Sequence, residues 1–185
     1  MVIGSRHEEV LESKDVYSGR VVNLRVDKVK LQCGASTTRE VVEHRGAAVI
    51  LAMPDECTIL MVRQYRFPVG LVLLELPAGT LEPDETPEIC AQRELIEETG
   101  FEAASFEKIL QFYPAPGYTT ELIHIFLATE LVEVGMKLDE DENLEVVRIG
   151  LNEALKKIER NEIRDGKTIC GMLALAMRKK LGIVL

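Results

Sequence analysis

The sequence has no tryptophan, and its aromatic residues amount to only 5%. This scarcity disfavours sites that stack bases or sugar rings on aromatic side chains. Basic residues are also in the minority, because 22 Lys and Arg stand against 31 Asp and Glu and give a formal net charge of −9. A chain this acidic does not attract nucleic acid or an anionic membrane through its overall charge, so we expect neither partner. An anionic substrate would need a bridging cation or a local basic group.

Cysteine pairs, long apolar runs and a leader segment are lacking as well. The four cysteines, at positions 33, 57, 90 and 170, form no CxxC pair and no spacing with histidine that is typical of zinc sites. We therefore expect free thiols. The apolar stretch at residues 169–177 is too short to span a bilayer. The N-terminus is polar by its fifth residue, which is unlike a signal peptide, so we expect a cytoplasmic protein.

The length of 185 residues, 46% of them hydrophobic, suits one domain with a short extension. Residues 8–45 alternate apolar and polar positions in short runs, which predicts the strands of a leading sheet. Residues 47–53 and 58–64 flank the turn-forming sequence PDEC and predict a β-hairpin. We therefore divide the chain into an extension over residues 1–45 and a main domain over residues 46–185.

The pattern after residue 70 mixes strands and helices without regular βαβ spacing. Thr86 as a hydroxyl N-cap, Pro87 at the first helical position and Gly100 as a stop predict a helix between them. The remaining expected elements are strands at 71–76, 122–131 and 145–149 and helices at about 152–160 and 167–180. This succession predicts an α/β (α+β) fold in which a mixed β-sheet is sandwiched between helices, with an N-terminal antiparallel strand extension.

The helix at 87–99 carries three clustered carboxylates. At about 100° per residue, Glu94, Glu97 and Glu98 share one arc. The apolar Ile89, Leu95 and Ile96 lie on the opposite side, where we expect the core. A solvated acidic face would explain such an arc equally well. However, like charges four residues apart destabilise a helix, and hard cations such as Mg²⁺ bind clustered carboxylate oxygens.

The residues around this helix resemble the Nudix box in full. Gly79 is followed after five residues by Glu85, and after seven more by Arg93 and the sequence RELIEETGF, which ends at Phe101. The chain is therefore identified as a member of the Nudix hydrolase family, over about residues 15–180. This resemblance implies a Mg²⁺-dependent hydrolase, with Mn²⁺ as a possible substitute, acting on nucleoside diphosphates linked to another group.

The resemblance also implies roles for the residues of the box. Glu94, Glu98 and the backbone carbonyl of Ala78 match metal ligands, and Glu97 matches a nearby ligand or catalytic partner. The positions that match structural residues of the motif are Gly79, Glu85, Arg93 and Gly100. Among these, Arg93 is expected to pair with Glu85 or a neighbouring acid and so hold the loop against the helix.

Features outside the box resemble the ADP-ribose pyrophosphatase subgroup. Pro116 lies fifteen residues after Phe101, and the sequence RQYR precedes the box at residues 63–66. Arg66 is a candidate for neutralising substrate phosphate, although it or Arg63 could equally be a solvated charge at a strand end. Glu75 is a candidate contact for adenine or ribose.

An acidic loop, DEDEN at residues 139–143, provides a candidate base. Such a run is often only solvated surface. By resemblance to the subgroup, Glu140 matches the general base and Glu142 a further metal ligand, but a shift of two residues would exchange these roles. Glu97 and Glu121 are the next candidates for the base.

The resemblance implies cleavage of ADP-ribose into AMP and ribose 5-phosphate, a small-molecule nucleoside diphosphate substrate. One alternative is another nucleoside diphosphate sugar, such as ADP-glucose or GDP-mannose. A second is a Nudix domain that binds ADP-ribose without cleaving it, although such modules usually lose box carboxylates. The leading strands resemble the extension through which this subgroup forms intertwined homodimers, so we expect a homodimer.

Overall fold

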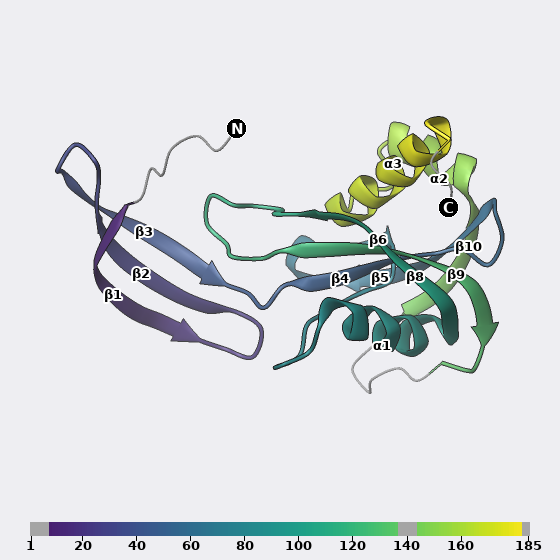
Figure 1. Cartoon of the computed structure of the whole chain (residues 1–185), viewed down its shortest axis with the longest axis horizontal. Coiled ribbons are helices and arrows are strands. Elements are labelled where there is room, and N and C mark those ends of the chain that lie inside the picture. The colour runs from purple at the N-terminus through teal and green to yellow at the C-terminus, as the bar shows by residue number, and fades with distance from the viewer. Residues whose placement is uncertain (1–7, 137–143, 183–185) are drawn as a thin grey trace.

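The structure is a computed structural model that describes residues 8–136 and 144–182, and it contains two separate sheets (Figure 1). The first sheet is antiparallel in the order β1–β2–β3, with bounds Glu9–Ser18, Asn23–Lys30 and Ser36–Glu43. The leading strands predicted from alternation are thus confirmed. Every residue of β1 is exposed.

The second sheet has seven strands and forms the body of the molecule. Its central order is β10–β5–β4–β9–β8, with β6 added to β5 and β7 added to β4. The bounds are β4 Ala47–Ala52, β5 Thr58–Arg66, β6 Leu71–Glu75, β7 Ala78–Thr80, β8 Phe101–Phe112, β9 Ile123–Glu133 and β10 Leu144–Gly150. The sheet is mixed, because β4 and β9 run parallel while the other paired strands are antiparallel.

The predicted hairpin at 47–64 is present but barely paired. β4 and β5 are antiparallel, yet Ala52 and Leu60 are the one pair in register along the described strands. The two strands then diverge, because β7 pairs with β4 from Ala47 to Val49 and β6 pairs with β5. This divergence opens the body of the sheet. The long strand β8 was not assigned from the sequence, since its residues, FEAASFEKILQF, do not alternate regularly between apolar and polar.

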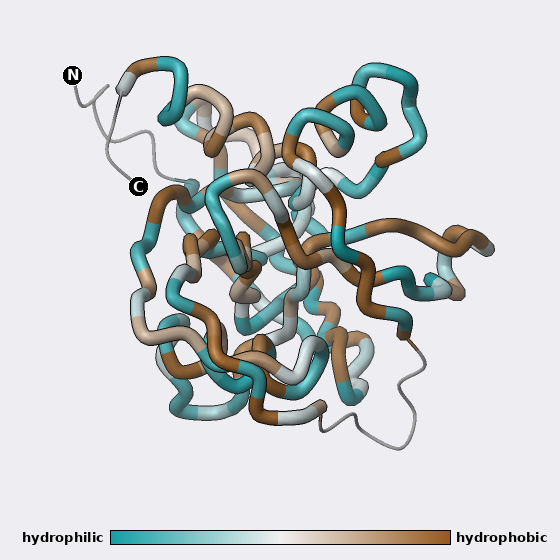
Figure 2. The backbone as a smooth tube through the Cα atoms, turned by 90° about the vertical axis from the view of Figure 1, so that its right-hand side faces the viewer, coloured by the Kyte–Doolittle hydropathy of each residue, from teal (hydrophilic) through white to brown (hydrophobic). Residues whose placement is uncertain are grey.

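Helices cover both faces of this sheet, which confirms the predicted layered fold. Helix α1 (Pro87–Thr99) lies on one face, and α2 (Leu151–Glu159) and α3 (Gly166–Lys180) lie on the other (Figure 1). Alternate residues of β4 point into two separate cores. Val49 and Leu51 pack in the same cluster as Met172 of α3, whereas Ile50 packs in the same cluster as Leu95 of α1. Apolar residues therefore recur along the central strands of the body (Figure 2).

The first sheet extends away from the body as an arm made of β1, β2 and β3 (Figure 1). Its base is held by backbone hydrogen bonds, because the Val42 amide donates to the Tyr118 carbonyl at 2.8 Å and the Thr120 amide donates to the Val42 carbonyl at 3.0 Å. Gly46 connects the arm to β4 with φ +96, and a Cβ there would lie 2.8 Å from the Leu122 carbonyl oxygen. The junction therefore requires glycine.

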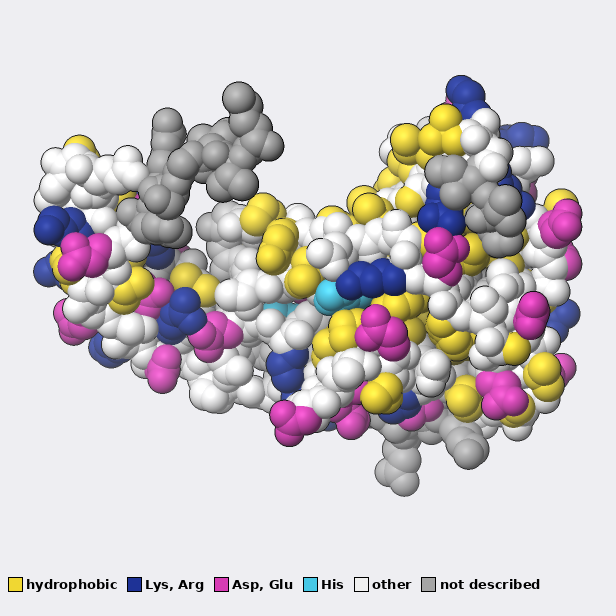
Figure 3. Space-filling model, in the orientation of Figure 1, with side chains coloured by type: hydrophobic (Ala, Val, Ile, Leu, Met, Phe, Trp, Pro, Cys, Tyr) yellow, Lys and Arg dark blue, Asp and Glu magenta, His cyan; other side chains and the backbone are white. Residues whose placement is uncertain are grey.

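Within the described part of the chain, no helix is both long and apolar enough to cross a membrane. Acidic and basic side chains are interspersed on the face shown in Figure 3, which also shows a broad recess between the arm and the helices α2 and α3.

Candidate metal and substrate site

Helix α1 has the ends that its sequence predicts. The Thr86 hydroxyl accepts a hydrogen bond from the Ile89 amide at 3.3 Å, and Pro87 occupies the first turn. At the other end, Gly100 adopts φ +75 and its amide donates to the Ile96 carbonyl at 2.9 Å. These caps fix where the helix begins and ends relative to the loop that precedes it.

The buried face of α1 differs from the prediction. Leu95, which was expected in the core, is fully buried, but Ile89, which was expected there as well, is 55% exposed. Glu94 and Glu98 are instead buried, at 8% and 2% exposure, beside Leu95. The prediction was wrong because it assumed that apolar positions alone choose the buried face. Here two carboxylates face a loop whose charged and backbone groups compensate for their burial.

Arg93 provides much of that compensation. Its Nε and Nη2 donate to the two carboxylate oxygens of Glu85 at 2.9 and 3.0 Å, as expected for the pair. Its Nη1 donates to Glu94 at 2.6 Å and to Glu97 at 2.9 Å. The hydrogen bonds to Glu85 raise the pKa of Arg93 above its usual range despite partial burial, and the pKa of Glu85 is lowered by the same bonds. Arg93 therefore ties the loop before α1 to the helix.

The two buried carboxylates lie against the short strand β7. The Ala78 amide donates to Glu98 Oε2 at 2.9 Å. Gly79 leaves space for Glu94, because a Cβ at this position would lie 1.7 Å from Glu94 Oε1 and 1.9 Å from its Cδ. Residues 78 and 79 therefore set the positions of both carboxylates, and a larger residue at 79 would displace Glu94.

The donor set on this face suits a hard divalent cation. Glu94 and Glu98 supply carboxylate oxygens one helical turn apart, next to the backbone of Ala78, and oxygen donors are what Mg²⁺ and Mn²⁺ prefer. Among residues 8–136 and 144–182, however, no group of three or more His, Cys, Asp and Glu side chains is close enough to hold a metal ion. Arg93 engages Glu94 and Glu97 in this arrangement. Glu140 and Glu142, the predicted base and further ligand, lie outside the described residues.

Arg66 and Glu75 lie together at the ends of β5 and β6. Arg66 Nε and Nη2 donate to the two oxygens of Glu75 at 2.9 and 2.8 Å. The Glu75 side chain is 1% exposed, whereas that of Arg66 is 37% exposed. Burial raises the pKa of Glu75, but the hydrogen bonds from Arg66 and the charge of Lys167 outweigh it, so the net pKa is lowered. An enclosed carboxylate with both oxygens engaged favours a role in holding Arg66 over direct contact with a substrate.

Arg63 is distinguished from Arg66 by its surroundings. It forms an exposed ion pair with Glu145 across β5 and β10. Arg63 is thus a solvated charge, as the sequence left open for either arginine, although it lies within β5 and not at its end. Arg66, in contrast, binds the buried Glu75, which lies three positions before Ala78, whose amide binds the box carboxylate Glu98.

Two other predicted residues lie near the base of the arm. Pro116 is exposed and lines a groove together with residues 39–41 of β3. Glu121 Oε1 lies 4.0 Å from His44 Nδ1. Pro116 and Glu121 thus lie beside the arm and its junction.

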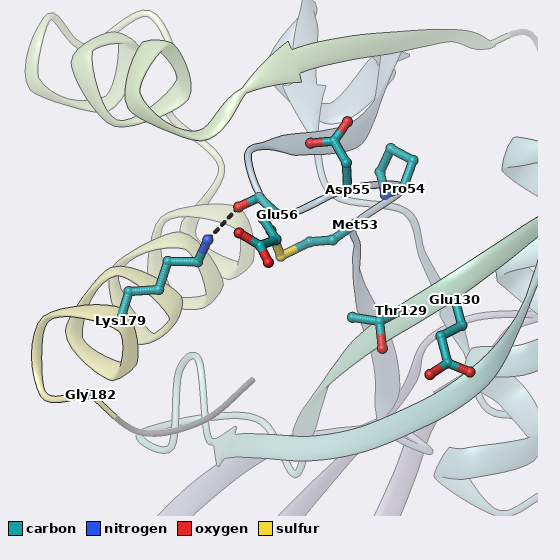
Figure 4. Close-up of a pocket in the computed structure, with 8 residues that line it drawn as sticks. All are labelled: Met53, Pro54, Asp55, Glu56, Thr129, Glu130, Lys179 and Gly182. Atoms are coloured by element: carbon teal, nitrogen blue, oxygen red, sulfur yellow. Dashed lines mark hydrogen bonds between the residues drawn. The ribbon is translucent and has the colours of Figure 1, made fainter.

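A larger cavity, of about 700 Å³, lies elsewhere in the fold (Figure 4). It is bounded by the turn between β4 and β5, by β9 and by the end of α3, where Lys179 donates to the Glu56 carbonyl oxygen. It contains none of the box residues.

Lys167 contacts Glu75 and was missed as a site residue, although the sequence DGKT at 165–168 marks its position.

Comparisons with known proteins agree with this geometry. A family model described as NUDIX domain matches residues 42–170. The chain is 42% identical to the ADP-ribose pyrophosphatase of Bacillus subtilis, covering 96% of this chain and 97% of that protein. It is 40% identical to the methanol dehydrogenase activator of Bacillus methanolicus, with coverages of 94% and 95%. It is 38% identical to a GDP-mannose pyrophosphatase of Salmonella paratyphi B, with coverages of 70% and 76%.

A solved structure shares the fold. The crystal structure of an ADP compounds hydrolase superposes with a TM-score of 0.83 at 22% identity and covers 96% of this chain and 97% of its own. The layered sheet, the capped helix with its Glu85–Arg93 pair, the carboxylates held against Gly79 and the match over residues 42–170 lead to one conclusion: the chain belongs to the Nudix family of hydrolases.

Proposed function

We propose that this Nudix hydrolase cleaves ADP-ribose into AMP and ribose 5-phosphate with the help of Mg²⁺, for which Mn²⁺ can substitute. The observation that carries the proposal is the pair of buried carboxylates, Glu94 and Glu98, held against residues 78 and 79. It is supported by a relative named ADP-ribose pyrophosphatase that matches nearly the whole chain at 42% identity.

The residues that would hold the metal are Glu94, Glu98 and the carbonyl of Ala78, with Glu142 as a further ligand. When bound, the ion stabilises negative charge on phosphoryl oxygens and lowers the pKa of the attacking water. Arg93 holds the loop at Glu85 and keeps Glu94 near the site. Arg66 directs positive charge toward the substrate phosphates.

Glu140 is the proposed general base, and it accepts the proton of the water that attacks phosphorus. Loss of a general base typically lowers the rate about 100- to 10,000-fold without weakening metal binding. Glu140→Gln should therefore lower kcat at every Mg²⁺ concentration, whereas Glu142→Gln should raise the Mg²⁺ concentration needed for half-maximal rate. The opposite result would exchange the two roles, and no effect from either change would make Glu97 or Glu121 the next candidate.

A second candidate substrate is another nucleoside diphosphate sugar. The 38% identity to a relative named GDP-mannose pyrophosphatase favours testing it, because that name gives a different nucleoside diphosphate sugar. A binding module without activity is less well supported, since Glu94, Glu97 and Glu98 are all present on α1.

The test is release of nucleoside monophosphate from a panel of ADP-ribose, ADP-glucose and GDP-mannose, measured with Mg²⁺ and with EDTA. We expect ADP-ribose to have the highest kcat/KM and EDTA to abolish activity. A higher kcat/KM for ADP-glucose or GDP-mannose would make that compound the substrate in place of ADP-ribose. Binding of ADP-ribose with no AMP release at any Mg²⁺ concentration would instead indicate a sensor.

We further propose that the chain is a cytoplasmic homodimer in which residues 1–45 form the contact between subunits. The arm supports this proposal, because β1 is exposed along its whole length and displays Val10, Leu11, Val16 and Tyr17 at exposures of 47% to 60%. Such a face is unusual on an isolated subunit. Sedimentation equilibrium at micromolar concentration should give twice the mass of one chain, and a fully active monomer would contradict the proposal.

A further inference from the structure

A network of charges joins helix α3 to the end of strand β6. Lys167, in the first turn of α3, forms an ion pair with the buried Glu75. Arg66 binds the same carboxylate through two hydrogen bonds, one of them to Oε2, the oxygen that Lys167 also contacts. Two cations from different elements therefore contact Glu75, namely Lys167 of α3 and Arg66 of β5. Arg66 is partly exposed.

Lys167 also compensates the negative charge of a second acid, Asp165. Its Nζ lies 3.1 Å from Asp165 Oδ2. Asp165 caps α3 by accepting hydrogen bonds from the amide and the hydroxyl of Thr168 at 3.0 and 2.6 Å. The Thr168 hydroxyl in turn accepts a hydrogen bond from the Leu76 amide at 2.8 Å. The start of α3 is thus connected to Glu75 through a charge and to the next residue, Leu76, through a hydrogen bond.

The charges in this cluster balance. Arg66 and Lys167 contribute two positive charges, and Glu75 and Asp165 contribute two negative charges. Without Lys167, Arg66 would be the one described cation that contacts Glu75, and the cluster would carry a net negative charge. Its attraction for an anionic phosphate would then fall.

Arg66 connects the cluster to the metal site. Two of its nitrogens hold Glu75, while its side chain remains 37% exposed. The carboxylate that it binds, Glu75, lies three positions before Ala78, whose backbone amide binds Glu98. The exposed part of the Arg66 guanidinium, near the box carboxylates, would therefore bind the phosphates of a substrate.

We propose that Lys167 is a positioning residue for substrate binding: it neutralises Glu75 and Asp165, so that the charge of Arg66 remains available to the diphosphate of a nucleoside diphosphate substrate. The inference rests on the proposed function, and it extends that function by assigning a role to a residue on α3 that does not itself contact the substrate.

The test is the steady-state kinetics of Lys167→Met with ADP-ribose at low ionic strength. At an effective dielectric constant of about 20, a unit charge about 10 Å from a phosphate changes binding roughly tenfold. We therefore expect KM to rise roughly tenfold while kcat changes less than about threefold, and the rise in KM should shrink in high salt because salt screens partly exposed charges. Lys167→Arg should restore KM, since it restores the charge.

Two controls separate this role from a merely structural one. Lys179→Met removes the same charge from the far end of α3 and should leave KM unchanged. In an Arg66→Met background, the further change Lys167→Met should raise KM by less than it does alone, because the part of its effect that acts through Arg66 is then absent. If Lys167→Met does not fold, Lys167→Gln keeps a hydrogen-bond donor without the charge and should show the same rise in KM.

The outcomes are distinct. Hydrolysis of ADP-ribose by the wild-type protein with an unchanged KM in the folded neutral variants would overturn this inference alone. A fall in kcat and in melting temperature at unchanged KM would likewise overturn it and assign Lys167 a purely structural role. Absence of activity and binding with every nucleoside diphosphate in the wild-type protein would overturn the proposed function, and the inference with it.

Discussion

Gly79→Ala tests whether the position of Glu94 matters for metal binding. The added Cβ would lie 1.7 Å from Glu94 Oε1, 1.9 Å from Cδ and 2.6 Å from Cγ, so the carboxylate must move by more than an ångström to reach an ordinary contact. The atoms that must move belong to the end of a flexible side chain. We therefore expect the fold to survive, with a loss of about 1 kcal/mol in the free energy of unfolding.

The effect on metal binding should be larger. Metal–ligand distances vary by only about 0.2 Å in a formed site, so a displaced Glu94 is lost as a ligand. Disturbing even the groups that orient a ligand costs about 10- to 100-fold in metal affinity or activity. We therefore expect the Mg²⁺ concentration for half-maximal AMP release to rise by at least that factor.

The assay is an Mg²⁺ titration of AMP release from ADP-ribose, with the melting temperature measured in parallel. Gly150→Ala is the matched control, because a Cβ at Gly150 meets nothing within 4 Å. The control should keep the Mg²⁺ dependence of the wild-type protein. Wild-type Mg²⁺ dependence in Gly79→Ala would refute the placement of Glu94 as a metal ligand.

Three further predictions follow from α1 and its loop. Glu98→Gln should lower turnover roughly 100-fold or more while the melting temperature changes little, because Gln can still accept the Ala78 amide hydrogen bond but is a poor metal ligand; near-normal turnover would contradict the metal role. Arg93→Met should lower the free energy of unfolding by about 3 kcal/mol in urea titrations, since it leaves buried carboxylates without their cation, and added Mg²⁺ should recover part of the loss. The Arg93 hydrogen bonds lower the pKa of Glu85 from its ordinary 4.5, so the stabilising effect of Glu85 is complete above pH 4.5 and is lost as the pH falls through the lower pKa of the folded state. Glu85→Gln should therefore be less stable than wild type at pH 7 and should lose less stability on acidification. Identical slopes of unfolding free energy against pH in the two proteins would contradict this.

The sequence by itself determined the local elements of the site. Thr86, Pro87 and Gly100 predicted the ends of α1 correctly, because capping depends on residues that are neighbours along the chain. The expectation that Arg93 pairs with Glu85 or a neighbouring acid is also confirmed, since Arg93 contacts Glu85 in the loop and Glu94 on the helix. The layered fold was predictable from the order of its strands and helices.

The buried face of α1 depended on the tertiary structure. Hydrophobic periodicity placed Ile89 in the core, yet the buried arc carries Glu94 and Glu98. Their burial is compensated by groups outside the periodic pattern, among them the Ala78 amide of β7 and Arg93, and Gly79 leaves the space that Glu94 occupies. Periodicity records which residues are apolar and does not record which polar groups will find partners.

The same reason explains the Arg66 cluster. The sequence separates Glu75 from Lys167 by 92 positions, and no local pattern relates them. Only the packing of α3 against the sheet brings the lysine to the carboxylate that Arg66 also binds. The sequence therefore determined which groups could carry the chemistry, whereas the tertiary structure decided which of them are buried, paired and left exposed, because desolvation and charge compensation act between residues that are far apart along the chain.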